Sequence, residues 1–593
     1  MDDHTMGRTF LTLCLLASLI CKVSAQPVSA EILPLSELKA GQHGEVWTVF
    51  QGTKPEPFAV EVSGVILNAL GPGKSIILCK LTDPRVQDMG AVAGMSGSPL
   101  YIEGKFAGAL SYQIQRFETV RYAGFTPAAD MEEVADRVPV TTGLGSAPDT
   151  GEASPPPPAT TDLGTTFQAM KPVFALGGVS PRTASIMAPQ FASIGLGIVA
   201  LGGSSPGNAA APANSTAALE PGDSVSVALT TGDISLAGTG TVSRVEGNRV
   251  VAFGHPMMSL GDVQFPMCSA DIIAILPSTE ESFKIANVGP VIGCISQDRL
   301  SAVSGTLGAG PAMTDVQVLV GPSGGPVHNL HFQVIRDRHI APMIMLTGVV
   351  EGVVGSNDHD PGDGFRIATT VTFSPTQQVS TEAVYAGEQG FEAGLIEFLV
   401  NLTTELENPF EKALPTSVQF RIEPMEDNPA VTVERFQVSR SSVRAGESFQ
   451  VTLGWRSFQG AEGTSTVDVP VDPSWTGKTL EVIVAPGRLL DELTGHGRMF
   501  RAGQLRSFDA YVEAMKSTRP EDGLCVAVVE RSALFFDQAV STPEAPASIE
   551  RIAAEADSAR YQRHEALVPL WETRVLQGKV SFTEFHKTVR VVE

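Results

Sequence analysis

Short apolar segments separated by turn residues are the feature that most restricts the fold of this chain. Segments such as 46–50, 58–62 and 225–229 are apolar or alternate between apolar and polar residues, and the 593 residues include 58 Gly and 41 Pro. A period of two is typical of β-strands, and glycine and proline mark the turns between strands. The pattern therefore predicts a mainly β protein with a few helices.

Length and charge set further limits. A single hydrophobic core stops growing at roughly 250 to 300 residues, so we expect several domains. The formal net charge is −24. Binding to phosphate groups needs a positively charged face. The negative net charge therefore argues against a nucleic-acid partner and against an anionic membrane surface.

The N-terminus has the pattern of a signal peptide. Arg8 precedes the apolar run 10–20, and Val23-Ser24-Ala25 offers small residues for cleavage. We expect residues 1–25 to be removed and the mature protein to be exported to a periplasm, a cell envelope or the medium. No later apolar run reaches the roughly 18 residues of a spanning helix. The alternative is a leader retained as an anchor.

The cysteines allow two interpretations. Cys14 and Cys21 lie in the leader, and the other four have neither CxxC nor zinc-like spacing. In an oxidising compartment four thiols could form disulfides in three pairings. Because each lies in an apolar context, buried unpaired thiols are equally compatible with the sequence. These four residues are Cys79, Cys268, Cys294 and Cys525.

Composition divides the chain into segments. Proline-rich and Ser/Ala-rich stretches mark a linker, and Ser180-Pro181 predicts the start of a short helix within it. Further helices are expected around 395–406, 505–515 and 547–563. The predicted organisation is a signal peptide at 1–25, a β unit at 26–143, a linker with a short helical segment at 144–218, a second β unit at 219–364, a β-sandwich-like region at 365–487 and a mixed α/β region at 488–593.

The first β unit contains the motif Gly94-Met95-Ser96-Gly97-Ser98-Pro99. A serine between glycines on a tight turn can expose its hydroxyl while neighbouring amides face one point, as an acyl-transfer nucleophile requires. The alternative is an ordinary turn between two strands. A hairpin is expected next, with strands at 100–102 and 106–110, and Thr126-Pro127 is expected to cap and start a helix.

The second β unit contains Phe253-Gly254-His255-Pro256. Residues 250–253 read as a strand, so His255 is expected at a strand end. Rigid placement of this kind suits a general base. The alternative is a structural histidine.

Together these two segments resemble the serine and histidine segments of the SpoIVB-type serine peptidases, over about residues 40 to 350. The resemblance implies a trypsin-like or related β-barrel peptidase region assembled from two β units and followed by a β-sandwich region. It also implies a protein or peptide substrate and no cofactor. Ser96 would be the nucleophile, His255 the general base, and the amides of Gly94 and Ser96 the oxyanion hole.

Two features depart from the family pattern. In the sporulation peptidase the histidine segment comes first, whereas here Ser96 precedes His255. The acidic member of a triad is also open: Asp262 and Asp83 are the alternatives, with Asp271 and Asp88 close to them in sequence. A non-catalytic envelope protein that retains a peptidase scaffold is therefore the alternative function.

Three other patterns have residue types found in catalytic or metal sites. Ser323, in Gly321-Pro322-Ser323-Gly324-Gly325-Pro326, follows His255 and resembles a trypsin-like serine motif, but Pro322 lacks an amide hydrogen. The acidic cluster at 358–363 lacks EF-hand spacing, and His328 and His331 lack HExxH spacing. We therefore expect no metal site.

Overall fold

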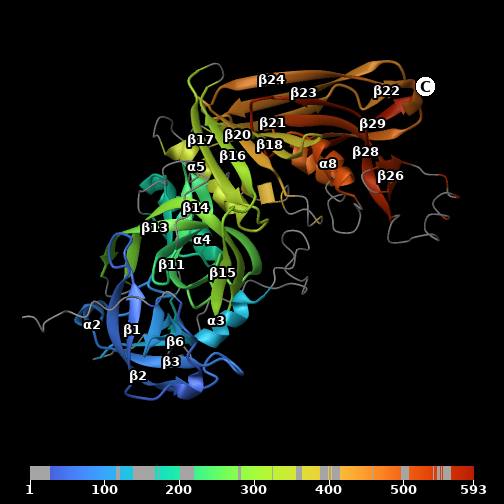
Figure 1. Ribbon diagram of the computed structural model, residues 1–593. Coiled ribbons are helices and arrows are strands. Elements are labelled where there is room, and N and C mark those ends of the chain that lie inside the picture. The colour runs from blue at the N-terminus through green and yellow to red at the C-terminus, as the bar shows by residue number, and fades with distance from the viewer. Residues whose placement is uncertain are drawn as a thin grey trace, which may run out of the picture.

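Figure 1 shows the computed structural model of the chain, with the N-terminal strands in blue and the C-terminal strands in orange and red. The structure describes residues 27–593 except for 28, 115–119, 138–166, 171–172, 201–218, 278–281, 323–324, 356–363, 387–397, 400–401, 404–405, 407–409, 411–413, 459, 496–506, 538–539, 544–545, 547, 549–550 and 552–561. The expected signal peptide and much of the expected linker lie outside the described residues.

The first unit is a closed, six-stranded antiparallel barrel. Its strands run in the order β4-β1-β2-β3-β6-β5, and β5 pairs with β4 to close the sheet. Alternating side chains such as Val46, Val60 and Val62 fill its core. The strands are β1 (His43–Thr48), β2 (Glu56–Ile66), β3 (Ile76–Leu81), β4 (Pro99–Ile102), β5 (Lys105–Ile114) and β6 (Tyr122–Pro127), with η1 (Leu35–Glu37) before β1 and α2 (Pro84–Met89) between β3 and β4.

Short elements connect this barrel to the next. They are α3 (Ala128–Ala135), β7 (Phe167–Ala169), β8 (Phe174–Gly177), α4 (Pro181–Ser193) and β9 (Ile198–Ala200). The helix predicted to begin at Ser180-Pro181 is confirmed, because the Ser180 hydroxyl accepts a hydrogen bond from Thr183 N. The helix predicted after Thr126 also forms, but the predicted cap is wrong. Pro127 ends β6 and occupies the N-cap position of α3, where no side chain makes a capping hydrogen bond.

The second unit is also a closed circuit of six antiparallel strands. β10 pairs with β13, and the order continues through β14, β15, β12 and β11 back to β10. The prediction of a mainly β chain with barrel units is confirmed. The strands are β10 (Ser224–Gly232), β11 (Ser235–Glu246), β12 (Arg249–Ala252), β13 (Gly261–Leu276), β14 (Phe283–Arg299) and β15 (Ala302–Leu307).

The sheet of the second unit continues beyond the barrel. β17 pairs with β10, and β16, β20, β18 and β19 follow in order. α5 is largely buried and lies against β16, β17 and β20, because its residues are apolar on nearly every face. These elements are β16 (Met313–Val320), β17 (His328–Ile335), α5 (Ala341–Val354), β18 (Phe365–Ser374), β19 (Gln377–Tyr385) and β20 (Ser417–Pro424).

The C-terminal region contains two sheets that share one core. Val433 and Val451 of one sheet belong to the same apolar cluster as Val482 and Val526 of the other, as in a β-sandwich. The sheets have the orders β21-β23-β24 and β22-β29-β25-β26-β27, and β28 also pairs with β26.

These C-terminal strands are β21 (Val431–Val438), β22 (Ser442–Arg444), β23 (Ser448–Ser457), β24 (Glu462–Pro470), β25 (Thr479–Ala485), β26 (Leu524–Asp537), β27 (Val540–Pro543), β28 (Gln562–Val575) and β29 (Phe585–Val592), and the helices are η3 (Pro473–Trp475), α7 (Gly487–Leu493) and α8 (Phe508–Lys516). α8 overlaps the expected helix at 505–515 and ends one residue later, at Lys516. The expected helices at 395–406 and 547–563 fall mostly outside the described residues, and residues 562–563 already belong to β28.

The two barrels are joined by backbone hydrogen bonds. The β13–β14 hairpin extends from the second barrel, and Ile272 exchanges two hydrogen bonds with Gly52 of the first, at 2.7 and 2.9 Å. The hairpin also reaches Ala93, immediately before the serine motif. None of the helices in the described segments is both long enough and apolar enough to cross a lipid bilayer.

Candidate active site

Ser96 lies on a tight turn between α2 and β4. Gly94 and Gly97 have φ angles of +95° and +94°, which glycine adopts with little strain. Met95 N donates to Val92 O at 2.8 Å and Ser98 N donates to Met95 O at 3.0 Å, so the turn is closed by its own backbone. The tight turn and the hairpin predicted after it, β4–β5, are both present.

Backbone and side-chain groups of the second barrel bind this turn. Thr241 N donates to Ser96 O at 2.8 Å, and the Thr241 hydroxyl donates to Gly94 O at 3.0 Å. Two residues further along β11, the Ser243 hydroxyl donates to Gly97 O at 2.7 Å. The position of the nucleophile candidate therefore depends on β11 as well as on its own barrel.

His255 follows the end of β12, as the sequence predicts. Phe253 and Gly254 both have positive φ angles, +70° and +69°, and the chain bends there. The Thr126 hydroxyl donates to Gly254 O at 2.6 Å. A Cβ atom at Gly254 would lie only 2.3 Å from Ser111 Oγ, so the first barrel leaves room for glycine alone. The first barrel thus holds the histidine segment, and the second barrel holds the serine turn.

The two segments meet at Thr241. Its carbonyl accepts a hydrogen bond from Phe253 N at 3.2 Å, while its amide binds Ser96. A Cβ atom at Gly97 would lie 2.4 Å from Phe253 N, so the turn and the histidine segment are in direct contact. Residues that are 159 positions apart (255 − 96) are brought to one region between the barrels.

Ser96 and His255 both have buried polar atoms without partners. Each residue is 0% exposed, and neither Ser96 Oγ nor His255 Nε2 has a hydrogen-bond partner among the described residues. Nδ1 of His255 lies 2.7 Å from Pro256 O. Because a carbonyl only accepts, Nδ1 carries the proton and Nε2 has a free lone pair. Burial lowers the pKa of His255 to about 4, which keeps the ring neutral at neutral pH.

The amides expected to form the oxyanion hole also lack backbone hydrogen-bond partners among the described residues. Gly97 N donates to Leu110 O at 2.7 Å, and Met95 N is also bonded. Within the described ranges, Gly94 N and Ser96 N have no such backbone acceptor. Among the described residues, the amides of Gly94 and Ser96 are therefore free of backbone hydrogen bonds.

The acidic residues predicted from sequence lie in other contacts. Asp83 caps α2 by accepting from Arg85 N at 2.9 Å, and Asp88 lies on that same helix. Asp262 accepts from Gln297 at 2.6 Å and pairs with Arg299 at 3.0 Å, and Asp271 lies on β13 opposite Asn287. Within the described residues, the structure shows no hydrogen bond from any of them to His255.

Asp298 is a functional candidate that the sequence did not indicate. It lies on β14, is 1% exposed, and binds three amides of the loop that follows His255. Met257 N donates to Oδ1 at 2.7 Å, and Met258 N and Leu260 N donate to Oδ2 at 2.8 and 3.2 Å. Burial raises the pKa of Asp298, against the effect of these hydrogen bonds. Asp298 is far from this loop in the sequence, so no local sequence pattern indicates that it binds the loop.

The alternative serine and the possible metal ligands seen in the sequence lie away from this site or outside the described residues. Ser323 and residues 358–363 lie outside the described residues. Nε2 of His331 is paired with Asp315 at 2.7 Å, and the described residues contain no cluster of metal-binding side chains.

The four cysteines are free thiols, and burial raises the pKa of Cys268 to about 12 and that of Cys525 to about 11. They are therefore poor nucleophiles at neutral pH.

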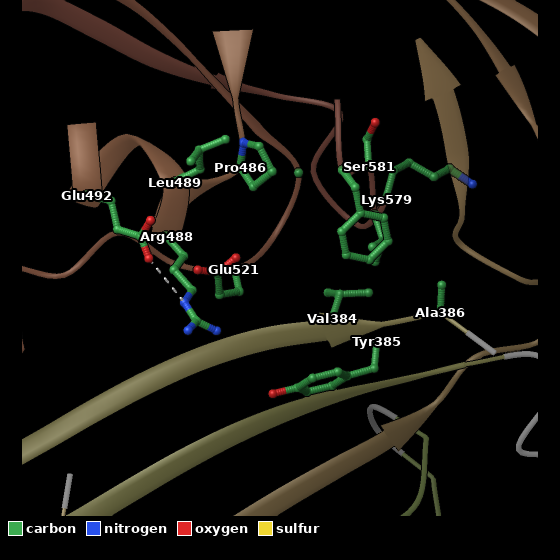
Figure 2. Close-up of a pocket in the computed structure, with 13 residues that line it drawn as sticks. Val384, Tyr385, Ala386, Pro486, Arg488, Leu489, Glu492, Glu521, Lys579 and Ser581 are labelled. Carbon is green, nitrogen blue, oxygen red and sulfur yellow. Dashed lines mark ion pairs between the residues drawn. The ribbon is translucent and has the colours of Figure 1, made fainter. Parts of the chain in front are cut away.

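A separate cavity of about 410 Å³ lies between β19 and the C-terminal region (Figure 2). Tyr385 and Val384 line it on one side, with Pro486 and Leu489 on the other, and Arg488 pairs with Glu492 at 3.9 Å. No residue predicted for the site contributes to its lining.

Comparison with protein families gives a match to part of the chain. Residues 20–125 match the SpoIVB peptidase S55 family. This confirms the predicted resemblance and covers the whole serine turn. The matched segment contains the serine turn and ends before the histidine segment. Comparison with curated proteins and with solved structures gave no match.

Proposed function

We propose that this protein is an exported serine peptidase that cleaves peptide bonds through an acyl-enzyme on Ser96. The S55 match supports peptidase chemistry of the SpoIVB kind. In the proposed reaction, Ser96 Oγ attacks the peptide carbonyl and His255 Nε2 takes the hydroxyl proton. The same proton then passes to the leaving amine, and water hydrolyses the acyl-enzyme with His255 again as base.

One observation carries this proposal. The only hydroxyl of the turn motif left unpaired by the described residues, that of Ser96, lies on a segment in contact with the segment of His255, whose Nε2 is also unpaired. Buried polar groups are nearly always hydrogen-bonded, and exceptions call for a functional explanation. By contrast, the neighbouring Ser98 hydroxyl donates to Met95 O at 2.6 Å. A nucleophile and its base that pair only when the site rearranges explain both exceptions.

The site is closed in this structure. Ser96 and His255 are fully buried, and they do not form a hydrogen bond with each other. A substrate carbonyl therefore reaches Oγ only after the turn or its cover moves, and catalytic hydrogen bonds often tighten only with substrate bound. The same burial favours the second candidate function, a binding protein with a peptidase scaffold that has lost turnover.

A fluorophosphonate probe separates the two functions. It reacts only with an activated serine, so the peptidase proposal predicts labelling of the mature protein and its loss in Ser96→Ala. The Ser98→Ala variant is the matched control and should still be labelled, because its hydroxyl is committed to Met95 O. Absence of labelling in the folded wild-type protein would support the binding protein.

A further inference from the structure

Lys284 is a buried lysine beside the serine turn that the proposed reaction does not use. It is the second residue of β14 and is 5% exposed. Ala93 N donates to Ser282 O at 2.8 Å, and Lys284 N donates to Ala93 O at 2.9 Å. Because Ala93 directly precedes Gly94, a strand of the second barrel is joined by its backbone to the start of the turn.

The side chain of Lys284 makes two further contacts. A Cβ atom at Gly94 would lie 3.0 to 3.2 Å from the Cβ, Cγ and Cδ atoms of Lys284, so the lysine stem fills the space beside this glycine. Its Nζ donates to the Thr48 hydroxyl at 2.9 Å, and Thr48 is the fully buried last residue of β1. One residue of the second barrel therefore contacts both the serine turn and a core strand of the first.

Packing alone does not explain a lysine at this position. A buried ammonium loses its hydration and needs compensating partners. In the part of the chain that the structure describes, its hydrogen-bond partner is a neutral hydroxyl, and no carboxylate forms an ion pair with it. Burial lowers the pKa of Lys284 to about 7. A methionine would fill the same space without this penalty.

We propose that Lys284 is a positioning residue of the Ser96 site, which fixes the Ala93–Gly94 end of the turn through its stem and through the hydrogen bond from Nζ to Thr48. This inference rests on the proposed function for its catalytic consequence. Fixing Gly94 fixes the direction of the Gly94 amide and the approach of Ser96 to His255. Small displacements of such groups reduce rates strongly, because the reaction needs aligned atoms.

The test is the Lys284→Met variant of the mature protein, which keeps the stem and removes the hydrogen bond. We expect the maximal rate of fluorophosphonate labelling to fall by about 10-fold or more, while the probe concentration for half-maximal rate changes little. A general loss of stability would not lower the maximal rate while leaving the half-maximal probe concentration unchanged. Hydrogen exchange of the segment 90–98 should become faster as the turn loosens.

Two variants make the test specific. Thr48→Val removes the acceptor and should slow labelling in the same direction, and the double variant should label no more slowly than Lys284→Met alone. Thr48→Val also serves as the test if Lys284→Met does not fold. Lys80→Met is the matched control on β3, where the half-buried lysine lies opposite Glu61, and it should label as wild type.

The outcomes separate this inference from the proposed function. If wild type is labelled at Ser96 and both variants label within about twofold of it, Lys284 is not a positioning residue and the peptidase proposal stands. If folded wild type is never labelled, the peptidase proposal fails. In that case faster exchange at 90–98 in Lys284→Met still supports the role of Lys284 in holding the turn, and unchanged exchange overturns it.

Discussion

At the scale of single residues, Gly97 combines a backbone constraint with a lack of space. Its φ angle is +94°, and a Cβ atom would lie 2.0 Å from Thr241 O. Gly104, at the turn between β4 and β5, has a similar φ of +79° with nothing within 4 Å. An alanine at Gly104 would therefore meet backbone strain alone, whereas an alanine at Gly97 would also collide with the second barrel.

Gly97→Ala should destabilise the protein much more than Gly104→Ala. We expect about 1 to 2 kcal/mol for Gly104→Ala, from the left-handed backbone alone. For Gly97→Ala we expect at least about 3 kcal/mol, because the turn must also move away from β11. Denaturant unfolding of both variants measures the difference. Equal losses would contradict the contact between the serine turn and Thr241.

The buried neutral ring of His255 predicts a dependence of stability on pH. Its pKa is 6.5 when unperturbed and about 4 in the folded protein. Between these values the unfolded chain binds a proton that the folded protein does not, so the free energy of unfolding decreases as the pH falls from 6.5 to 4. His255→Gln lacks this component, and its stability should decrease less over the same range.

Unfolding free energies of wild type and His255→Gln, measured across that pH range, test this prediction. Carboxylates elsewhere titrate in both proteins and cancel in the difference. Parallel curves for the two proteins would contradict the burial of a neutral imidazole at this position.

At the scale of elements, the loop between β12 and β13 is held by one carboxylate. Asp298 on β14 accepts from the amides of Met257, Met258 and Leu260. An asparagine has one acceptor oxygen and an NH₂ group in place of the second, so it cannot bind all three amides. The loop that carries His255 should then lose its fixed position.

Asp298→Asn should reduce the rate of probe labelling by about 10- to 100-fold. Asp522→Asn is the matched control in the C-terminal region, since Asp522 is 5% exposed and accepts from Gly578 N at 2.5 Å. It should lower stability but leave labelling unchanged. Labelling of Asp298→Asn at the wild-type rate would mean that the loop does not position His255.

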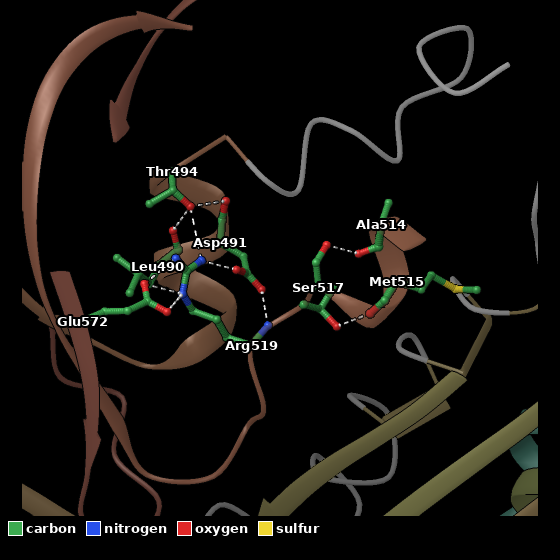
Figure 3. A network of polar contacts seen from close by, with 9 residues as sticks. Leu490, Asp491, Thr494, Ala514, Met515, Ser517, Arg519 and Glu572 are labelled. Atoms are coloured by element: carbon green, nitrogen blue, oxygen red, sulfur yellow. Dashed lines mark hydrogen bonds and ion pairs between the residues drawn. The ribbon is translucent and has the colours of Figure 1, made fainter. Parts of the chain in front are cut away.

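At the scale of the whole molecule, the C-terminal region has its own polar network (Figure 3). Arg519 pairs with Asp491 and with Glu572, at 2.7 Å for the latter, and its amide donates to Asp491 Oδ2 at 3.0 Å. Asp491 is 6% exposed, so removal of the guanidinium would take from a buried carboxylate its ion pair with Arg519.

Arg519→Met should therefore destabilise the protein by about 3 kcal/mol. Arg440→Met, which removes an exposed pair with Glu447 in the same region, should cost less than about 1 kcal/mol. Thermal unfolding measures both effects. Labelling at Ser96 should be unchanged in folded Arg519→Met, because this network shares no residue with the two barrels. Loss of labelling would show that the C-terminal region supports the site.

The local features of this molecule could be predicted from its sequence. The serine turn, the hairpin after it, and His255 at a strand end each depend on neighbouring residues, and patterns of glycine, proline and alternating apolar residues predict such features. Sequence reasoning missed the groups that hold the site together. Thr126 binds Gly254 from 128 positions away, and Asp298 binds Met257 from 41 positions away. Such partners are set by how the barrels assemble, which no local pattern encodes.

The central claim is that Ser96 reacts because His255 is its base. The most direct measurement is identification of the modified residue, by mass spectrometry of digested protein after fluorophosphonate treatment, in wild type and in folded His255→Ala. We predict a probe adduct on Ser96 in wild type and none in His255→Ala. An adduct on Ser323, or an equal yield on Ser96 in both proteins, would contradict the claim.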